Sequence, residues 1–344
     1  MARVLDCNAK RQCFVACTLT LGAYNPRMSA AIRVSNLVKT YPGRPPVEAV
    51  RGVSLEVRRG ECFGLLGPNG AGKTTTLEII EGLLAPTSGD VEVLERRWDT
   101  DNRAIRERIG ISLQETRLPD RLTVRETVEL FRSFYPSGIS PQEAVAAVSL
   151  QEKTGSYVDR LSGGQKQRLA VACALVGDPE MLFLDEPTTG LDPQSRRELW
   201  DVVRAYKGRG RTVLITTHYM DEAERLCDRV AVIDHGKVIA IGAPSELILN
   251  AGGEHVIDVR LADDAGACPV AAEDLARLPT VAAVRPADGG FALSAAEPHT
   301  ALPALLVLLQ QKGITPAGLG TRLATLDDVF LALTGRHLRD GESA

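Results

Sequence analysis

The sequence CFGLLGPNGAGKTTTLEII at residues 62–80 holds an apolar run, a glycine-rich turn and an amphipathic segment in succession. The apolar run predicts a strand that ends at Leu66, and the last segment predicts a helix with one buried face. Between them, residues 67–74 match the phosphate-binding pattern G-x-x-x-x-G-K-[ST]. Glycines let backbone N–H groups point inward without a Cβ clash, so that these groups and the following helix N-terminus can hold an anion. The stretch therefore predicts a P-loop between a strand and a helix.

The residues of this loop are the first candidates for nucleotide binding. Lys73 is expected to reach the β- and γ-phosphates, and Thr74 to offer its hydroxyl to Mg²⁺. The alternative, a glycine-rich turn with a surface lysine, does not explain the strand before it and the helix after it. The nucleotide-binding residues expected here are Gly67, Pro68, Asn69, Gly70, Ala71, Gly72, Lys73, Thr74 and Thr75.

The composition is that of an ordinary globular chain. Its 344 residues suggest about two domains at roughly 150 residues each. A formal net charge of -4 gives no sign of the concentrated basic face that nucleic-acid readers carry, so no nucleic-acid partner is expected. Seven cysteines without a CxxC pair argue against a disulfide framework or a zinc site and favour a cytosolic compartment. No apolar run reaches the roughly 18–20 residues that cross a bilayer, so no transmembrane segment is expected.

A second candidate site follows the apolar run Met181–Leu184, which predicts a buried strand. Asp185 and Glu186 come directly after it, and the carboxyl end of a parallel strand is where ligands collect in such sheets. Asp185 is expected to hold Mg²⁺ through water, and Glu186 to act as the base that polarises an attacking water. A solvated acidic strand end is the alternative interpretation of the pair alone.

Strand-like and helix-like runs alternate from Ala31 to about Ala243, which predicts a mainly parallel sheet covered by helices. Residues 47–57 alternate apolar and polar positions and predict an antiparallel ribbon, whereas residues 102–155 are helix-rich after Leu113. The fold class is therefore α/β, a P-loop NTPase core with an antiparallel β subdomain and a helical insertion. The strands expected in the sheet are Ile32–Val38, Glu61–Leu66, Met181–Leu184, Thr212–Thr216 and Arg229–Ile233.

The pattern restarts after a boundary near residues 250–253 and predicts a small α+β domain of order βαββαβ. Its elements are strand His255–Leu261, helix Ala271–Leu278, strands Val281–Arg285 and Phe291–Ser294, helix Ala301–Gln311 and strand Ile314–Leu319. A last helix is expected after Thr325, with Asp328 completing a capping box and Gly335 ending it.

Three parts of the chain follow from this organisation. Residues 29–248 form the nucleotide-binding domain, and residues 249–344 form a C-terminal accessory α+β domain. Residues 1–28 are expected to be a disordered extension, or an over-long start with Met28 as the working initiator. The apolar stretch within them is short and no small-x-small cleavage site follows, which argues against a signal peptide.

Residues 161–165 read Leu-Ser-Gly-Gly-Gln and precede a helix predicted from about Gln165 to Leu175. The Ser162 hydroxyl and the N–H groups of Gly163 and Gly164 form a second anion site at a helix N-terminus. LSGGQ is the ABC signature, and the chain resembles the ABC ATPase family. The resemblance implies that Ser162–Gln165 of one subunit close on ATP held by the P-loop of a second subunit, so that two subunits sandwich two nucleotides.

Four further positions match the family in its order. The resemblance implies that Tyr41 stacks on adenine, that Gln114 senses Mg²⁺ and the transmembrane partner, and that Asp192 in Gly-Leu-Asp contacts the other subunit. It also implies that His218 contacts the γ-phosphate. The expected catalytic residues are thus Glu186, His218 and Gln114, and the expected metal ligands are Thr74, Gln114 and Asp185.

The C-terminal run TLDDVFLALTGR at residues 325–336 looks like the tail of bacterial drug-exporter ATPases of the daunorubicin-resistance type. This implies the ATP-hydrolysing motor of an exporter of drugs or other hydrophobic compounds, bound to a separate permease at the cytoplasmic face of the membrane. The alternatives are the ATPase of an importer, a non-transport ABC ATPase, and a module that binds ATP without hydrolysing it. The intact Glu186 and His218 argue against the last of these.

Overall fold

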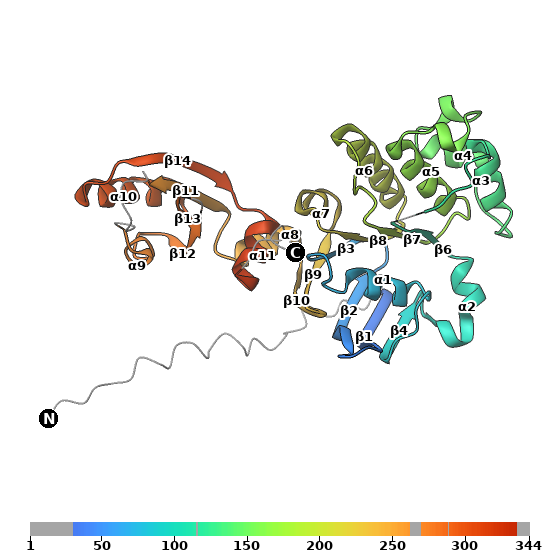
Figure 1. Cartoon of the computed structure of the whole chain (residues 1–344), viewed down its shortest axis with the longest axis horizontal. Coiled ribbons are helices and arrows are strands. Elements are labelled where there is room, and N and C mark those ends of the chain that lie inside the picture. The colour runs from blue at the N-terminus through green and yellow to red at the C-terminus, as the bar shows by residue number, and fades with distance from the viewer. Residues whose placement is uncertain (1–29, 115, 262–269, 288, 336–344) are drawn as a thin grey trace.

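The strand before the P-loop lies inside a six-stranded sheet of order β10-β9-β3-β8-β7-β6. The computed structural model describes residues 30–114, 116–261, 270–287 and 289–335 (Figure 1), so the extension expected at residues 1–28 lies outside the described residues. All neighbours in the sheet are parallel except β9 and β10, as predicted for a mainly parallel sheet. The strands are β3 (Cys62–Leu66), β6 (Ile109–Ser112), β7 (Met181–Asp185), β8 (Thr212–Thr217), β9 (Arg229–Asp234) and β10 (Lys237–Gly242).

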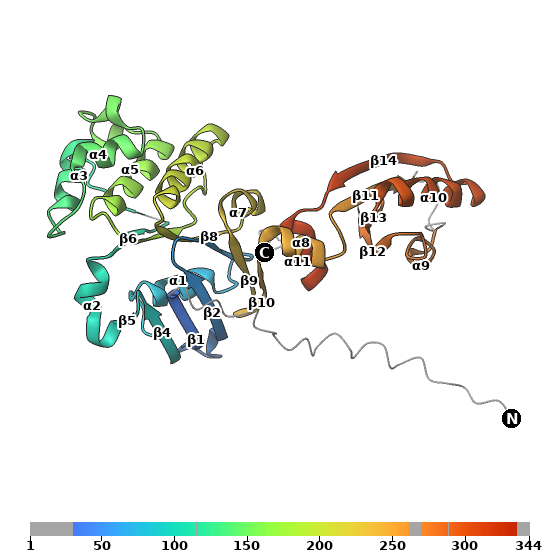
Figure 2. The ribbon, with the colours of Figure 1, turned by 180° about the vertical axis from the view of Figure 1, so that it is seen from behind.

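Both faces of this sheet are buried, and successive residues of each strand face opposite layers. In β7, Met181 and Phe183 join one hydrophobic cluster, while Leu182 and Leu184 join the other. Helix α1 (Lys73–Ile80) belongs to the first layer and α5 (Gly163–Leu175) to the second, on opposite sides of the sheet in Figure 2. The second layer also contains α6 (Pro193–Gly208) and α7 (Met220–Leu226).

An antiparallel sheet of order β2-β1-β4-β5 packs over the layer that contains α1. β1 (Ala30–Tyr41) pairs with β2 (Val47–Arg58), which confirms the ribbon predicted from the alternation of residues 47–57. On its other edge, β1 pairs with β4 (Ser88–Val93), and β5 (Arg96–Arg97) completes the sheet.

The helix-rich stretch after β6 is helical, as predicted. It contains α3 (Val124–Arg132), α4 (Pro141–Ala147) and two short 3₁₀ turns before α5. Thr123 with Glu126 and Ser140 with Glu143 form capping boxes that satisfy the first N–H groups of α3 and α4. Before β6 lies α2 (Trp98–Arg106).

Beyond α8 (Pro244–Asn250) a third sheet, the C-terminal sheet, has the order β12-β13-β11-β14 and its own hydrophobic core, shared with one face of α10. Its elements are β11 (His255–Leu261), α9 (Ala272–Leu275), β12 (Val281–Ala287), β13 (Gly290–Ala295), α10 (Pro298–Gln311) and β14 (Pro316–Leu323). The order βαββαβ is the predicted one. The α-helix is shorter than the predicted helix 271–278, because the residues at its C-terminal end make i→i+3 hydrogen bonds. The last strand extends beyond its predicted end at Leu319, because it pairs with β11 as far as Leu323.

The last helix, α11 (Leu326–Thr334), has the predicted capping box of Thr325 with Asp328 and ends at Gly335. Leu326, Val329 and Phe330 join the hydrophobic cluster of α5, α6 and α7 rather than that of the C-terminal sheet. In Figure 1 the helix accordingly lies beside α8, between the six-stranded sheet and the C-terminal sheet.

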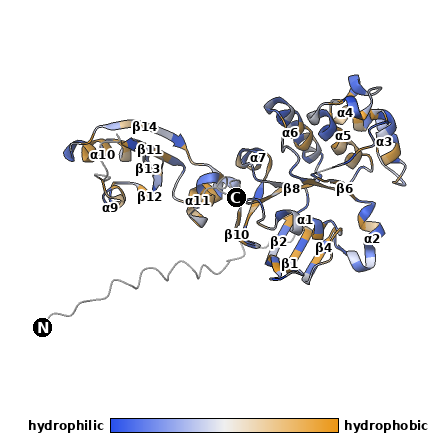
Figure 3. Ribbon diagram, viewed as in Figure 1, coloured by the Kyte–Doolittle hydropathy of each residue, from blue (hydrophilic) through white to orange (hydrophobic). Residues whose placement is uncertain are grey.

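The hydropathy of the described helices shows whether any of them is suited to a bilayer. Figure 3 shows hydrophilic and hydrophobic residues alternating around α6, as expected for a helix with one buried face. In the described ranges, every helix is too short or too polar to span a membrane.

Gly110 in β6 offers a test of how tightly the sheet packs on α5. A Cβ at this position would lie 2.2 Å from the carbonyl oxygen of Ala174, so Gly110→Ala forces backbone to move. We expect the free energy of unfolding in urea to fall by about 1–3 kcal/mol. Gly208→Ala is the control, since a Cβ there meets nothing within 4 Å. Equal stability of the two variants would contradict the packing described.

Candidate functional site

The P-loop connects β3 to α1. Its backbone conformation requires a glycine at the start of the helix. Gly72 has φ 98° as the N-cap of α1, and a Cβ there would lie 2.3 Å from the carbonyl oxygen of Ala49. Lys73 begins the helix, and its Nζ donates to the carbonyl oxygens of Gly67 (2.9 Å) and Pro68 (3.1 Å). The lysine is therefore folded over its own loop, and its side chain is 4% exposed.

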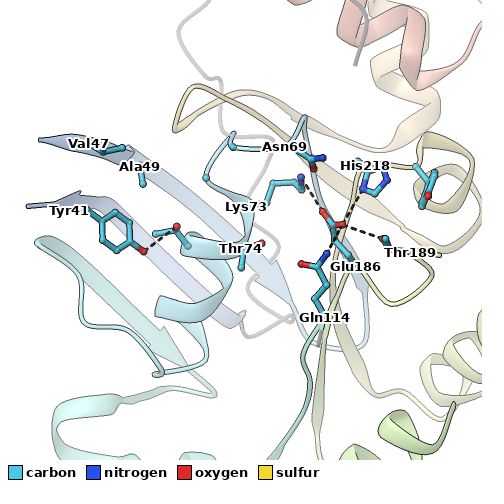
Figure 4. Close-up of a pocket in the computed structure, with 14 residues that line it drawn as sticks. Tyr41, Val47, Ala49, Asn69, Lys73, Thr74, Gln114, Glu186, Thr189 and His218 are labelled. Carbon is cyan, nitrogen blue, oxygen red and sulfur yellow. Dashed lines mark hydrogen bonds and ion pairs between the residues drawn. The ribbon is translucent and has the colours of Figure 1, made fainter. Parts of the chain in front are cut away.

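The loop borders an open cavity of about 630 Å³ (Figure 4). Ten of the residues that line it are among the predicted site residues, and they come from five different segments of the chain. These are Tyr41, Asn69, Gly70, Gly72, Lys73, Thr74, Thr75, Gln114, Glu186 and His218. The sequence patterns thus converge on one place in the fold.

The Glu186 carboxylate lies at the centre of a cluster of donors, as Figure 4 shows. Its Oε1 is 3.4 Å from Lys73 Nζ, and its Oε2 is 3.2 Å from His218 Nδ1. The same Oε2 accepts from Gln114 Nε2 (3.4 Å) and Thr189 Oγ1 (3.2 Å). The cluster joins the P-loop, the segment after β6 and the ends of β7 and β8 through a single carboxylate.

The backbone at Glu186 aims the carboxylate at this cluster. Its φ is 43°, in the left-handed region that a side chain rarely adopts. Its N–H is held by the carbonyl oxygen (3.1 Å) and Oγ1 (2.9 Å) of Thr216 in β8. A strained residue that its neighbours hold in place is typical of a functional site.

The groups in this cluster shift the pKa values of their neighbours. The interaction with His218 is the main cause that lowers the pKa of Glu186 to about 2, against the opposing effect of burial. Burial lowers the pKa of Lys73, and the nearby Glu186 carboxylate opposes that shift. Glu186 is therefore ionised at neutral pH, and its carboxylate is a weak base while these partners stay in place.

Asp185 lies behind Glu186, at the end of β7, and is 4% exposed. Burial raises the pKa of its carboxyl group, while hydrogen bonds from Thr216 Oγ1 and Thr74 act the other way. A desolvated carboxylate beside a threonine hydroxyl is an oxygen donor set that suits Mg²⁺. No group of three His, Cys, Asp or Glu able to hold a metal occurs in the described part of the chain.

Tyr41, at the end of β1, stands at the rim of the cavity. Its hydroxyl lies 3.4 Å from Thr75 Oγ1, and Lys39 Nζ lies 5.3 Å from the centre of its ring. The ring borders the open side of the cavity, next to the P-loop (Figure 4).

The signature residues do not line this cavity in the same chain. Ser162 is the N-cap of α5, its Oγ accepts from Gln165 N (3.3 Å), and its own N–H donates to Gln165 Oε1 (3.0 Å). Asp192 likewise caps α6 by accepting from the N–H groups of its first turn. The predicted residues outside the cavity lining are Gly67, Pro68, Ala71, Asp185, Ser162, Gly163, Gly164, Gln165 and Asp192.

Sequence patterns missed four residues that line the cavity: Val47, Ala49, Thr189 and Tyr219. Val47 and Ala49 lie on β2, and their place depends on how the antiparallel sheet packs over the loop. Thr189 and Tyr219 follow predicted residues closely, so proximity in sequence to Glu186 and His218 is the signal that could have found them.

Comparisons with known proteins identify a family and relatives of this chain. Residues 50–189 match the protein family described as ABC transporter. The chain is 40% identical over 330 residues to Nod factor export ATP-binding protein I of Burkholderia orbicola, covering 90% of this chain and 99% of that protein. It is 38% identical over 323 residues to the protein of the same name from Sinorhizobium fredii, covering 91% and 89%.

Solved structures match somewhat more than half of the chain. The ATP-binding cassette MJ0796, a dimer in a post-hydrolysis state bound to ADP and Pi, has a TM-score of 0.57 and 29% identity, covering 62% of this chain and 98% of that chain. A second match is cbiO1 from Clostridium perfringens, part of the ABC transporter complex cbiONQ. Its TM-score is 0.56 with 31% identity, covering 63% and 90%.

The interaction between His218 and Glu186 can be tested by NMR. Because His218 is the main cause of the low pKa of Glu186, His218→Ala should raise that pKa from about 2 toward the ordinary value. At pH 4 the Glu186 carboxyl carbon of a ¹³C-glutamate-labelled chain should report an ionised group in the parent and a partly protonated one in the variant. His299→Ala, at an exposed histidine, is the control. The same protonated fraction in all three chains would contradict the assignment.

Proposed function

We propose that this chain, which belongs to the ABC transporter family of ATP-binding proteins, is the motor subunit of an exporter that works with a separate transmembrane permease. It is an ATPase of that family. The observation that carries the proposal is the Glu186 cluster, in which one carboxylate contacts the P-loop lysine, the Gln114 amide and the His218 imidazole. A module that only stores ATP has no need of a carboxylate placed between the phosphate loop and these groups.

Export is favoured by the relatives, which are named as export ATP-binding proteins. The likeness covers 90% of this chain in the first of them, so it includes most of the part beyond the ATPase body. The tail of daunorubicin-resistance type at residues 325–336 points the same way, and we propose a drug or another hydrophobic compound as cargo. The chain would then act at the cytoplasmic face of the membrane, held there by the permease.

Most residues of the cavity have a proposed role in binding ATP. The P-loop N–H groups and Lys73 hold the phosphates, and the Tyr41 ring stacks on adenine. Thr74, Gln114 and Asp185 would hold Mg²⁺, which neutralises charge on the phosphates when it is bound. The antiparallel sheet contributes Val47 and Ala49 to the wall beside the base.

Catalysis follows from how ATP changes the Glu186 cluster. Without nucleotide, His218 and Lys73 together lower the pKa of Glu186, so the carboxylate is a poor base. The γ-phosphate competes for Lys73, and Glu186 then loses one of the charges that lower its pKa. The freed carboxylate can polarise a water, and His218 is near enough to hold the phosphate that this water attacks.

The second half of each site comes from a second copy. Ser162 and the two glycines after it lie outside the cavity of their own chain, although they form an anion site. We infer that they contact the γ-phosphate bound by the P-loop of the other copy. Closure of the two copies then depends on ATP, because the phosphate contacts exist only in the closed dimer.

Glu186→Gln tests the proposed base. The amide keeps the shape of the side chain but cannot take a proton, so ATP hydrolysis should fall by about 10²–10⁴-fold. ATP should still be bound and should hold the variant as a dimer in size-exclusion chromatography. The control is Glu129→Gln at an exposed position on α3. Hydrolysis by Glu186→Gln at the parent rate would show that another group is the base.

Mixed dimers test the shared site. Lys73→Ala removes the P-loop cation and Ser162→Arg blocks the signature, so each variant alone should lose hydrolysis. An equal mixture should regain about a quarter of the parent rate, because about half of the dimers are mixed and each has one intact site. No recovery over either variant alone would argue against a site built from two copies.

A further inference from the structure

The imidazole of His218 contacts a second aromatic ring besides its contact with Glu186. It lies against the ring of Tyr219, with 4.1 Å between the ring centroids and 41° between the ring planes. The Tyr219 N–H donates to Thr217 Oγ1 (2.9 Å), so the backbone is fixed on both sides of His218. Tyr219 also lines the nucleotide cavity. A ring packed on the imidazole therefore borders the place where ATP is proposed to bind.

A cation from another helix lies over this tyrosine ring. The guanidinium carbon of Arg196, on α6, is 4.3 Å from the centroid of the Tyr219 ring. A guanidinium within about 6 Å of an aromatic centroid is attracted to the face of the ring, and more strongly where water is excluded. The Arg196 side chain is 21% exposed, so most of it is removed from water.

Hydrogen bonds do not explain where the Arg196 guanidinium lies. Its Nε is buried and has no hydrogen-bond partner in the described part of the chain. Its Nη1 is 3.8 Å from Asp221 Oδ2, and the Asp221 side chain is 54% exposed. A long ion pair to an exposed carboxylate contributes little, because water screens it. The contact with the Tyr219 ring is therefore the main interaction that positions this guanidinium.

Helix α6 also fixes the helix that follows His218. One turn beyond Arg196, Trp200 Nε1 donates to Glu222 Oε1 of α7 (3.0 Å), and both side chains are buried. Arg196 lies in the first turn of α6, where its N–H donates to the carbonyl oxygen of the N-cap residue Asp192 (3.0 Å). Trp200 thus anchors α7 as a whole, whereas Arg196 reaches the residue directly beside the imidazole.

The imidazole needs support because its orientation decides which ring atom faces Glu186. His218 Nδ1 lies 3.2 Å from Glu186 Oε2. A half-turn about the Cβ–Cγ bond would put a ring carbon in the place of Nδ1, and this torsion is broad and roughly two-fold in histidine. An aromatic ring packed against the imidazole face resists that rotation.

We propose that Arg196 is a positioning residue for ATP hydrolysis. Its guanidinium holds the Tyr219 ring, and that ring holds the His218 imidazole in the orientation that faces Glu186. Arg196 does not line the nucleotide cavity, so it acts through Tyr219. The inference rests on the proposed function, which gives His218 its role at the γ-phosphate.

Steady-state hydrolysis of ATP by the full chain tests this role. Arg196→Gln removes the cation, so kcat should fall about threefold to tenfold while KM stays within about twofold of the parent. Arg196→Lys keeps a charge but not the planar guanidinium, so its kcat should lie between the two. Arg204→Gln makes the same change at a half-exposed arginine further along α6, and Asp221→Asn removes the long ion pair. Both of these controls should keep the parent kcat.

A double-mutant cycle shows whether the effect of Arg196 passes through the ring. Tyr219→Leu keeps an apolar side chain but removes the ring, so adding Arg196→Gln to it should lower kcat by less than about twofold further. Independent losses that multiply in the double variant would overturn the proposal. A parent kcat in Arg196→Gln, or a change confined to KM, would overturn it as well.

Proton NMR of the nucleotide-free chain reports on the imidazole itself. His218→Ala identifies the His218 ring signals among those of the five histidines. In Arg196→Gln these signals should shift, because the Tyr219 ring moves and its ring current at the imidazole changes. Arg204→Gln should leave them in place. Coincident His218 signals in the parent and Arg196→Gln would overturn the proposal.

The kinetics of His218→Ala separate this inference from the proposed function. A kcat that falls in His218→Ala but not in Arg196→Gln would overturn the role of Arg196 and leave the proposed function standing. A parent kcat in His218→Ala would overturn the role that the proposed function gives to His218.

Discussion

The buried ion pair of Lys73 and Glu186 is the contact on which the site depends. Both side chains are almost fully removed from water, and each charge would be costly without the other. The pair also joins two elements that meet only in the folded chain, the P-loop and the end of β7. Under the proposed function, a phosphate that binds the loop would compete for the same lysine, so nucleotide binding would also release the carboxylate. This constraint would link affinity for ATP to readiness for hydrolysis.

Much of this site could be predicted because its determinants are local. The P-loop is defined by eight consecutive residues between a strand and a helix, and the cap of Thr325 with Asp328 is defined by four. The part played by Ala49 could not be predicted, because it depends on the packing of the antiparallel sheet over the loop. The longer β14 has the same origin, since its end is fixed by pairing with β11.

Glu81 shows another limit of sequence patterns. A glutamate at the end of an amphipathic helix is normally a solvated residue, and its neighbours in sequence give no contrary sign. In the folded chain its side chain is 1% exposed, and burial raises the pKa of its carboxyl group to about 8. It lines a cavity together with residues of α2, β6 and α5, which come together only through the sheet order. The burial of this carboxyl group is thus information that the fold adds to the sequence.

The last helix, α11, connects the C-terminal sheet to the part of the chain that contains the Glu186 cluster. Apolar residues of α11 complete the hydrophobic cluster that contains α7, and the N–H of Leu326 donates to Glu224 Oε1 (2.7 Å) in that helix. Asp328, which caps α11, accepts hydrogen bonds from Arg285 and Arg322 of the C-terminal sheet. Helix α7 begins two residues after His218. The C-terminal sheet is therefore joined through α11 to the segment that carries His218, whose imidazole lies beside Glu186. A shift of that sheet has a direct structural route to the Glu186 cluster.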